Sequence, residues 1–398
     1  MSHPIATLPA ARVRPDAPGA LLAVLALALL LLSLPYPVLQ LAGEDGFTLN
    51  PVAWWAVQTV APGWVAWGTG LATGMAALLA LRATLGRAAT LALTLLTVAA
   101  LGGLIALTPT EEQGAVGSGF WLCTGAVALL ALVTVARVSA LPLPRGLDAA
   151  SALLFGLWVL LFWELLTTAF AVPRVLLPPP SSVAVALWTH AATLRDDLVQ
   201  TVGKAVLIGY VLGCGLGVAV GIAIDRLPFL QRGLLPVASL TSTVPLVGVA
   251  PIAVMWFGFD WPSKAAVVVL MTFFPALIST LAGLGAAGKL ERELMFSYAA
   301  SDRRTLLDLR LPVALPFIFN ALKVNATLAL IGAIVAEFFG SPTVGLGFRI
   351  STEASRMNMP LVWATIVVAS AVGMLAYALL GRLERRVNFW HPAIRAAA

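Results

Sequence analysis

The chain has 398 residues, of which 60% are hydrophobic and only 11% are charged. Soluble globular proteins carry about a quarter charged residues, so this composition excludes an ordinary soluble enzyme and indicates a protein that lies in a lipid bilayer. The net charge of +6 does not indicate a nucleic-acid partner, because the basic residues lie in short loops between apolar runs.

The long apolar runs predict an all-α polytopic membrane protein. About 20 helical residues cross a hydrocarbon core of roughly 30 Å, and backbone groups in lipid need partners within their own segment. We expect ten membrane helices, near residues 19–41, 58–81, 88–108, 119–140, 148–170, 197–224, 232–257, 263–285, 313–338 and 360–382. Residues 43–57 and 181–196 are expected to form surface helices on the outer side, with Trp54 and Trp55 in the headgroup region.

The basic residues predict the orientation of these helices. An N-terminus on the cytoplasmic side places 17 of the 24 Lys and Arg residues on that side, as the positive-inside rule requires. These residues are Arg12, Arg14, Arg82, Arg87, Arg137, Arg145, Arg226, Arg232, Lys289, Arg292, Arg303, Arg304, Arg310, Arg382, Arg385, Arg386 and Arg395. An even number of helices then places both termini in the cytoplasm.

A domain boundary is expected in the sequence LPLPRGLD at 141–148, where prolines and an arginine separate two apolar blocks. Residues 1–145 form an N-terminal membrane domain of about four helices, and 146–398 hold the other six helices. Cys123 and Cys214 lie in apolar runs without metal-ligand spacing, and the three histidines are scattered. We therefore expect neither a metal site nor a catalytic set of side chains.

Small residues and prolines mark two helices of the second block. Glycines recur every fourth residue in one of them, at 209, 213, 217 and 221, which allows helix backbones to approach closely. Close packing within the chain and a sliding or dimer contact are both compatible with this spacing. Pro245 and Pro251 break another helix, so that freed carbonyl groups line a cavity or the helix carries a static kink.

The charged segment at 289–312 is unlike the rest of the chain, and from Glu293 it reads ELMFSYAASDRRTLLDLRLP. Leu290, Leu294 and Tyr298 lie on one helical face. Ser301 has the character of an N-cap residue. We expect two short helices joined at 299–301 and lying flat at the inner membrane face, with Pro312 ending the unit. Such an element either rests on lipid or docks on a cytoplasmic partner.

A nucleotide-binding loop is not expected in this chain. Gly283, Gly288 and Lys289 fit the spacing G-x-x-x-x-G-K, but Leu290 follows where a hydroxyl residue must bind the metal. The sequence also ends a membrane helix instead of joining a strand to a helix.

Three ionisable residues lie inside apolar runs, where charge is costly and usually faces the bundle interior or a water-filled cavity. Glu337 lies near the outer end of its helix and either lines a solute path or pairs with a backbone amide or a basic group of the outer loop. Lys323 either contacts the path or pairs with a helix end. Structural pairing is expected for Glu164, in the middle of the fifth helix.

The charged segment resembles the EAA loop of ABC-importer permeases, which has a Glu, a Gly six residues later and a Leu-Pro twelve residues beyond. Glu293 and Leu311-Pro312 match this pattern, while Ala299 stands at the Gly position. Leu294 is typical of the nitrate, sulfonate and taurine branch, and Met295 replaces the second Ala. The flanks at 239–284, 314–350 and 383–392 are similar to the same branch, which also includes permeases for thiamine precursors. The resemblance covers about residues 146–398 and does not cover the first 145.

This resemblance implies a type I importer core of six helices, preceded here by four extra helices, in the bacterial cytoplasmic (inner) membrane. It implies as partners a dimer of ATP-binding-cassette ATPases, a second permease copy and a periplasmic or lipid-anchored solute-binding protein, and no enzyme activity in this chain. ATP-Mg would be bound by the partner ATPase, and this chain would hold no cofactor. The residues that it assigns to ATPase coupling are Glu293, Ser297, Tyr298, Ala299, Ala300, Ser301, Asp302 and Arg303.

The resemblance also implies a path for a small organic solute, either sulfonate-like or taurine-like or pyrimidine-like. The residues expected on this path are Pro245, Pro251, Lys323 and Glu337. Arg349, Glu353 and Arg356 are expected to dock the binding protein. The alternatives are a membrane-embedded enzyme, which needs convergent polar residues at one depth, and a passive channel or scaffold, which works without an ATPase.

Overall fold

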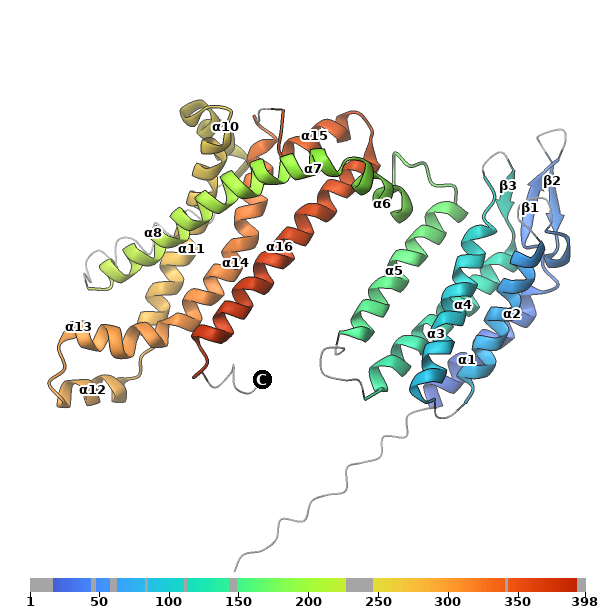
Figure 1. Ribbon diagram of the computed structural model, residues 1–398, viewed down its shortest axis with the longest axis horizontal. Helices are drawn as coiled ribbons and strands as arrows, with labels where there is room; N and C mark the ends of the chain where they lie inside the picture. Colours follow the sequence, from blue (N-terminus) through green and yellow to red (C-terminus); the bar gives the residue numbers. More distant parts are fainter. Residues whose placement is uncertain are drawn as a thin grey trace, which may run out of the picture. The chain divides into compact units, whose positions relative to one another are not determined.

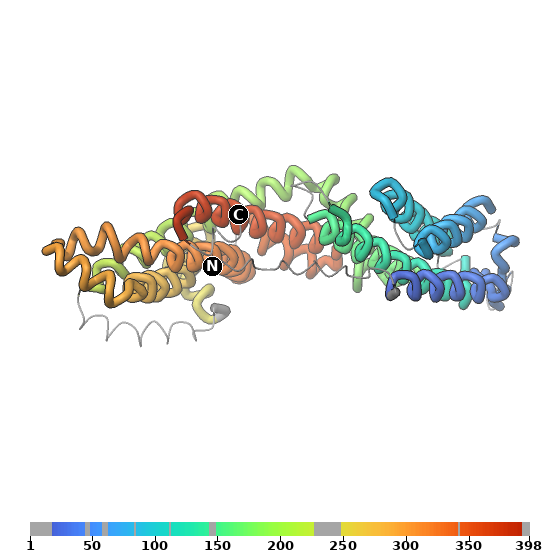
Figure 2. Tube along the Cα trace, turned by 90° about the horizontal axis from the view of Figure 1, so that it is seen from below, coloured from blue at the N-terminus to red at the C-terminus, as the bar shows by residue number. Residues whose placement is uncertain are grey.

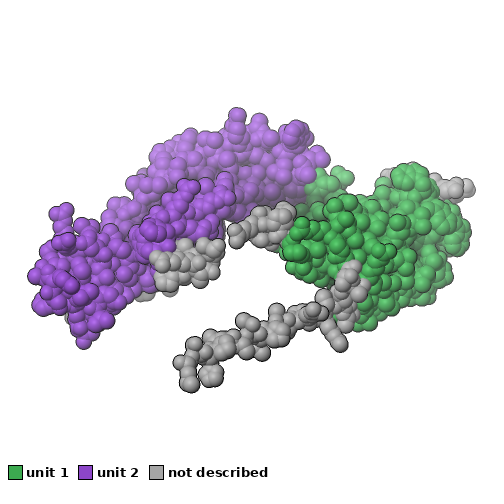
Figure 3. All heavy atoms as spheres, turned by 60° about the horizontal axis from the view of Figure 1, so that its bottom comes forward, with its two compact units in different colours: residues 1–182 green, residues 183–398 purple. Residues whose placement is uncertain are grey.

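A computed structural model describes residues 17–43, 48–57, 63–82, 85–110, 113–142, 149–226, 246–340 and 343–391 of the chain. The chain divides into two compact units, residues 1–182 and 183–398, which Figure 3 colours separately. Each unit has its own internal packing.

The all-α polytopic fold is confirmed. Within the described ranges, eight helices are long and apolar enough to cross a membrane, and two shorter apolar helices accompany them. Unit 1 holds α1 (Ala17–Ser33), α2 (Gly63–Ala80), α3 (Arg87–Ala106), α4 (Ser118–Ala140) and α5 (Ala150–Ala169). Unit 2 holds α10 (Leu246–Phe257), α11 (Trp261–Gly285), α16 (Met359–Val387) and two composite helices at 191–224 and 302–337. Each helix overlaps a predicted one, and residues 232–245 of the seventh prediction lie outside the described residues.

Unit 1 is a helical bundle with an apolar core. The core includes the fully buried side chains of Leu93, Leu101 and Phe120. Its buried threonines are satisfied within their own helices, because each hydroxyl donates to a carbonyl three or four residues earlier, as Thr73 does to Thr69. These bonds allow polar side chains to lie inside a membrane bundle without the cost of unpaired groups.

The predicted surface helix at 43–57 is wrong. This region carries the strands β1 (Leu39–Ala42) and β2 (Leu49–Val52), which form a three-stranded antiparallel sheet with β3 (Gly114–Val116). Among the described residues of this range, the 3₁₀ turn η1 (Trp54–Ala56) is the one helical part. The first helix ends at Ser33 because prolines follow it at 35 and 37, and the chain then pairs as strands.

The sheet also depends on Gly114, whose φ of +140° is unfavourable for other residues. A Cβ atom there would lie 2.0 Å from the carbonyl oxygen of Gln40. Trp54 is buried, and its indole nitrogen donates to the carbonyl of Ser33 over 3.2 Å. This tryptophan therefore packs inside unit 1 instead of facing the headgroup region.

By packing, α5 belongs to the first unit. Trp158 and Leu165 of α5 are part of the buried core that α1–α4 form, and the Trp158 indole donates to Thr134 Oγ1. Glu164 accepts hydrogen bonds from the backbone N–H and the hydroxyl of Ser181, at 2.8 and 2.7 Å, so it is paired structurally. The division by packing at 182/183 therefore lies later than the predicted boundary at 145/146.

Unit 2 is built around α11, which packs against α8 (Leu207–Ile224) and α14 (Leu311–Glu337) (Figure 1). Before α8 the chain forms α6 (Pro180–Thr189), α7 (Ala191–Leu198) and the π-helical η2 (Val199–Val206). The predicted surface helix at 181–196 is thus helical, in two parts that meet at His190. A short helix, α15 (Leu346–Ser355), connects α14 to α16.

Four of the five glycines of α8, those at 209, 213, 217 and 221, bring its backbone against α11. A Cβ atom at Gly213 would lie 2.0 Å from Thr272 Oγ1, and one at Gly217 would lie 2.4 Å from the carbonyl oxygen of Phe273. Both glycines therefore serve close packing within the chain, which was one of the two predicted readings. Asn325 of α14 closes the same interface, because its side-chain amide donates to the carbonyl of Thr272 over 2.8 Å.

We expect Gly217→Val to separate α8 from α11, since its side chain meets backbone that cannot move aside. Overpacking of this kind costs about 3 kcal/mol, which should lower the thermal unfolding midpoint of the purified chain clearly. Gly215→Val is the matched control, because a Cβ atom at Gly215 meets nothing within 4 Å. An equal loss in both variants would show that helix propensity, and not the α8–α11 contact, sets the effect.

Candidate functional site

The charged segment forms a helical hairpin at one end of unit 2. Its two arms are α12 (Lys289–Ser297) and α13 (Asp302–Thr305), as predicted. Figures 1 and 2 show both arms at the same end of the unit, far from α7 and α15. Short helices in place of a plain loop make this end of the unit stiff.

The apolar face of the hairpin is uncovered within the described chain. Leu290, Leu294 and Tyr298 of this face are 77%, 57% and 79% exposed, and α12 has no buried residue. Phe296, on the other side of α12, is 85% exposed. Glu293 is also at the surface, where it forms an exposed ion pair of 3.7 Å with Lys289. Large apolar side chains beside charges, on a helix outside the bundle, are typical of a surface that binds another molecule.

The turn between the two arms is a Schellman motif. The N–H of Ala299 donates to Phe296, and the N–H of Ala300 donates to Met295, at 2.9 and 3.0 Å. Ala299 has a φ of +48°, in the left-handed region that favours glycine. The turn that glycine makes in the resembling loop is therefore kept here with an alanine.

Ser301 begins the second arm as the predicted N-cap residue. Its hydroxyl accepts a hydrogen bond from the N–H of Arg304 over 3.4 Å. Asp302 and Arg303 follow in the exposed first turn, and the Ser297 hydroxyl bonds back to the carbonyl of Glu293. The predicted coupling residues thus lie together along the exposed hairpin.

The hairpin does not end at Pro312, contrary to the prediction. The chain continues from α13 through the π-helical turn η3 (Leu306–Arg310) into α14. Pro312 lies in the first turn of α14, where a missing N–H costs little. The second arm is therefore a direct extension of a membrane helix.

An ion pair holds the base of the hairpin. Arg310 donates to both carboxylate oxygens of Asp225 at 2.7 Å, and it also donates to the carbonyl of Leu284. Asp225 caps α8, and Leu284 is in the last turn of α11. One guanidinium group thus joins three helices where the hairpin leaves the bundle. Sequence analysis missed this pair, because 85 residues separate its members.

Two of the predicted path residues are paired inside unit 2. Lys323 forms a 2.7 Å ion pair with Glu384 of α16. Glu337 is buried and accepts hydrogen bonds from the hydroxyl of Thr201 and the N–H of Gly347, at 2.7 and 2.6 Å. Pro251 lies inside α10, and Pro245 lies outside the described residues.

The first N–H groups of α15 meet side-chain acceptors from other helices. The Glu337 carboxylate accepts from the N–H of Gly347, and the Thr201 hydroxyl accepts from the N–H of Leu346. The Asp197 carboxylate accepts from the N–H of Gly345. This three-part clasp fixes α15 to α7, η2 and α14. Asp197 and Thr201 were not predicted as partners of α15, because 148 and 145 residues separate them from Gly345 and Leu346.

The predicted docking residues differ in their accessibility. Arg349 donates to Asp197 over 2.8 Å, and this hydrogen bond raises the pKa of the arginine above its ordinary value. Glu353 is buried and accepts from Arg356 and Asn358. Arg349 and Glu353 therefore hold α15 in place, while the side chain of Arg356 is 68% exposed and available to another molecule.

Comparisons with known proteins agree with this arrangement. Residues 209–389 match the family described as binding-protein-dependent transport system inner membrane component. The formylaminopyrimidine transport permease ThiX of Halalkalibacterium halodurans is 31% identical over 62% of this chain and 98% of its own length. The riboflavin permease RibX of Chloroflexus aurantiacus is 30% identical over 59% and 88%. The taurine permease TauC of Escherichia coli is 28% identical over 60% and 88%.

We expect the hairpin turn to be sensitive to the side chain at position 299. The left-handed conformation costs a β-branched residue more than alanine, so Ala299→Val should open the turn by about 1 kcal/mol. Trypsin cleavage at Arg303 and Arg304 should then become about fivefold faster, while Ala299→Gly should not accelerate it. Ala300→Val is the control, because position 300 does not have a positive φ. Faster cleavage in both valine variants would contradict the role given to the turn.

The Arg310–Asp225 pair should matter far more than a surface pair on the same helix. Arg310→Gln leaves the nearly buried Asp225 carboxylate uncompensated and should lower the free energy of unfolding by about 3 kcal/mol. Arg304→Gln removes an exposed pair with Asp308 and should cost less than about 1 kcal/mol. Thermal unfolding of the purified variants measures both effects, and similar losses would refute the assignment.

Proposed function

The chain belongs to the binding-protein-dependent transport system inner membrane components, the permeases of ABC importers, and we propose that it couples solute transport to a separate ATPase through the α12–α13 hairpin. In this proposal the chain is the membrane-spanning subunit, and ATP-Mg is bound and hydrolysed by a dimer of partner ATPases. A second permease copy completes the path. The protein lies in the bacterial cytoplasmic membrane with both termini in the cytoplasm.

The observation that carries the proposal is the exposed face of a stiff hairpin. Leu290, Leu294 and Tyr298 form one exposed apolar face, and Phe296 projects from the other side of α12, so that all four side chains are available to another protein. The second arm continues into α14, and Arg310 ties that arm to α8 and α11. In this proposal, a push on the hairpin is carried into α8, α11 and α14 through these contacts. Transport follows if the ATPase binds the hairpin differently in its open and closed states.

We propose a small organic solute as the cargo. The relatives ThiX, RibX and TauC are named as permeases for formylaminopyrimidine, riboflavin and taurine. Lys323 forms an ion pair with Glu384, and Glu337 accepts hydrogen bonds from other residues of unit 2. Both charged side chains that were expected on the path therefore already have partners. A separate solute-binding protein would then supply the affinity, and this chain would supply a path of low affinity.

The solute-binding protein is proposed to dock beside α15, at the opposite end of unit 2 from the hairpin (Figure 1). The clasp of Asp197, Thr201 and Glu337 would make this surface rigid. Among the three docking residues predicted from the sequence, Arg356 is the exposed one. It is therefore the residue that we propose contacts the binding protein.

Copurification tests the coupling proposal. The full chain is expressed with its ATPase, and the ATPase retained per permease is measured after affinity purification. Phe296→Ala and Tyr298→Ala should each reduce retention at least tenfold, as expected for aromatic anchors of an interface, and Glu293→Lys should release the ATPase as well. Trp188→Ala is the control, because Trp188 is 86% exposed on α6, away from the hairpin. Full retention in the three hairpin variants would overturn the proposal.

A further inference from the structure

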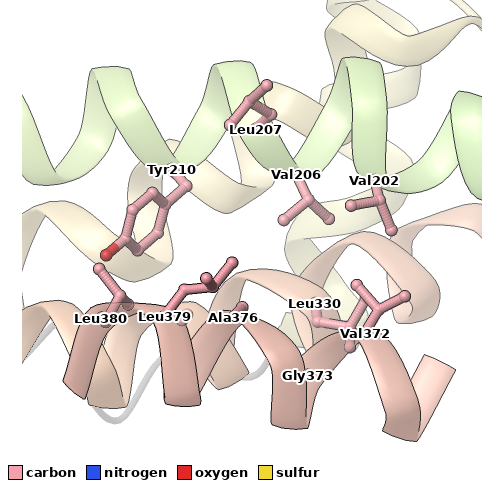
Figure 4. Close-up of a pocket in the computed structure, with 11 residues that line it drawn as sticks. Val202, Val206, Leu207, Tyr210, Leu330, Val372, Gly373, Ala376, Leu379 and Leu380 are labelled. Carbon is pink, nitrogen blue, oxygen red and sulfur yellow. The ribbon is translucent and has the colours of Figure 1, made fainter. Parts of the chain in front are cut away.

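An apolar groove crosses the middle of unit 2. It has a volume of about 260 Å³ and lies between η2 with α8 on one side and α16 on the other, with α14 at its base (Figure 4). Its lining includes Val206, Tyr210, Leu330, Val372, Ala376 and Leu380. Figure 4 shows these side chains from the two facing helices directed toward the space between them.

The groove is suited to hydrocarbon and not to a polar solute. The Tyr210 hydroxyl is its one side-chain polar group, and this hydroxyl donates to the carbonyl of Leu322 over 2.9 Å. A polar ligand would therefore lose its hydrogen bonds to water without replacement, which is costly. An alkyl chain has no hydrogen bonds to water to lose, and it gains van der Waals contacts with the side chains that line the groove.

Exposed cations follow the groove-lining residues along α16, and two of them, Arg382 and Arg386, lie on the side of the helix nearer to the groove, while Arg385 lies on the opposite side. Arg382, Arg385 and Arg386 are exposed, and none of them has an ion-pair partner within the part of the chain that the structure describes. Glu384 does not neutralise them, because it pairs with Lys323 at 2.7 Å. Guanidinium groups bind phosphate with two parallel hydrogen bonds, so Arg382 and Arg386 suit a phosphate ester.

The spacing between the groove and the cations fits one molecule. Val372, Leu379 and Arg386 recur at seven residues and therefore lie on one stripe of α16. The helix rises about 21 Å between Val372 and Arg386, which exceeds half of a hydrocarbon core of roughly 30 Å. An acyl chain that begins at the level of Arg386 can thus extend through the groove.

We propose that this groove and the two arginines nearer to it form a binding site for an anionic phospholipid. One acyl chain lies between α8 and α16, and the phosphate lies at Arg382 and Arg386. The bound chain fills the space between the two helices and supports α16, which has few buried side chains toward its charged end. This site is separate from the hairpin and does not depend on the proposed coupling.

Photolabelling of the full-length protein tests the site. The probes are phosphatidylglycerol and phosphatidylcholine with identical diazirine-bearing acyl chains, and labelled peptides are identified by mass spectrometry. We expect phosphatidylglycerol to label peptides of α8 and α16 at least fivefold more than phosphatidylcholine. Gly373→Leu should abolish most of this labelling by filling the groove. The double variant R382Q/R386Q should remove the preference for the anionic lipid.

Two controls keep the outcome interpretable. Gly381→Leu makes the same change in the same helix outside the groove lining, so it should label like the wild type. Arg356→Gln removes an exposed arginine from α15 and should keep the lipid preference. The proposal is overturned if both lipids label equally, or if G373L and G381L behave alike. Absence of labelling in the wild type, as expected when a second copy or another helix covers the groove, also overturns it.

Discussion

A charge inside a membrane bundle requires a partner, and this requirement organises unit 2. Arg310 pairs with Asp225, Lys323 pairs with Glu384, and Arg349 pairs with Asp197. Each pair joins helices that are distant in the sequence. Because charge in lipid is expensive unless it is compensated, these pairs favour one arrangement of the helices over others that leave a charge alone. The glycine contact of α8 with α11 then brings the helices near enough for the pairs to form.

Much of this arrangement follows from local sequence, and some does not. Apolar runs of membrane length predicted the ten helices, and the capping character of Ser301 predicted where the second arm of the hairpin begins. The face of Leu290 and Tyr298 was also visible from helical spacing. The partners of Arg310 and Lys323 were not predictable, since 85 and 61 residues separate the members of these pairs. The hydrophobic periodicity of a helix shows which of its faces is apolar, but it does not show which other helix packs against that face.

The errors have the same origin. The short strands β1 and β2 carry apolar residues in runs too short to distinguish from the end of a helix. The other neighbour of β1 in the sheet is β3, whose residues are about 75 positions later in the chain. Pro312 was read as a stop, although proline is tolerated in the first turn of a helix. For Glu337, the predicted alternative of a backbone amide partner was correct, since the N–H of Gly347 donates to its carboxylate. Its second partner, Thr201, became visible only through the three-dimensional structure.

The π-helical turn η3 affects the direction in which the exposed side chains of the hairpin point. A π-helical turn closes its hydrogen bonds one residue later than an α-helical turn does, and each residue of an α-helix corresponds to a rotation of about 100°. The orientation of the exposed aromatic side chains about the axis of α14 is therefore set by the backbone at 306–310, not by their own sequence. Related chains with and without this π-helical turn would present the same side chains in different directions. Sequence similarity at the hairpin therefore does not by itself make two permeases interchangeable on one ATPase.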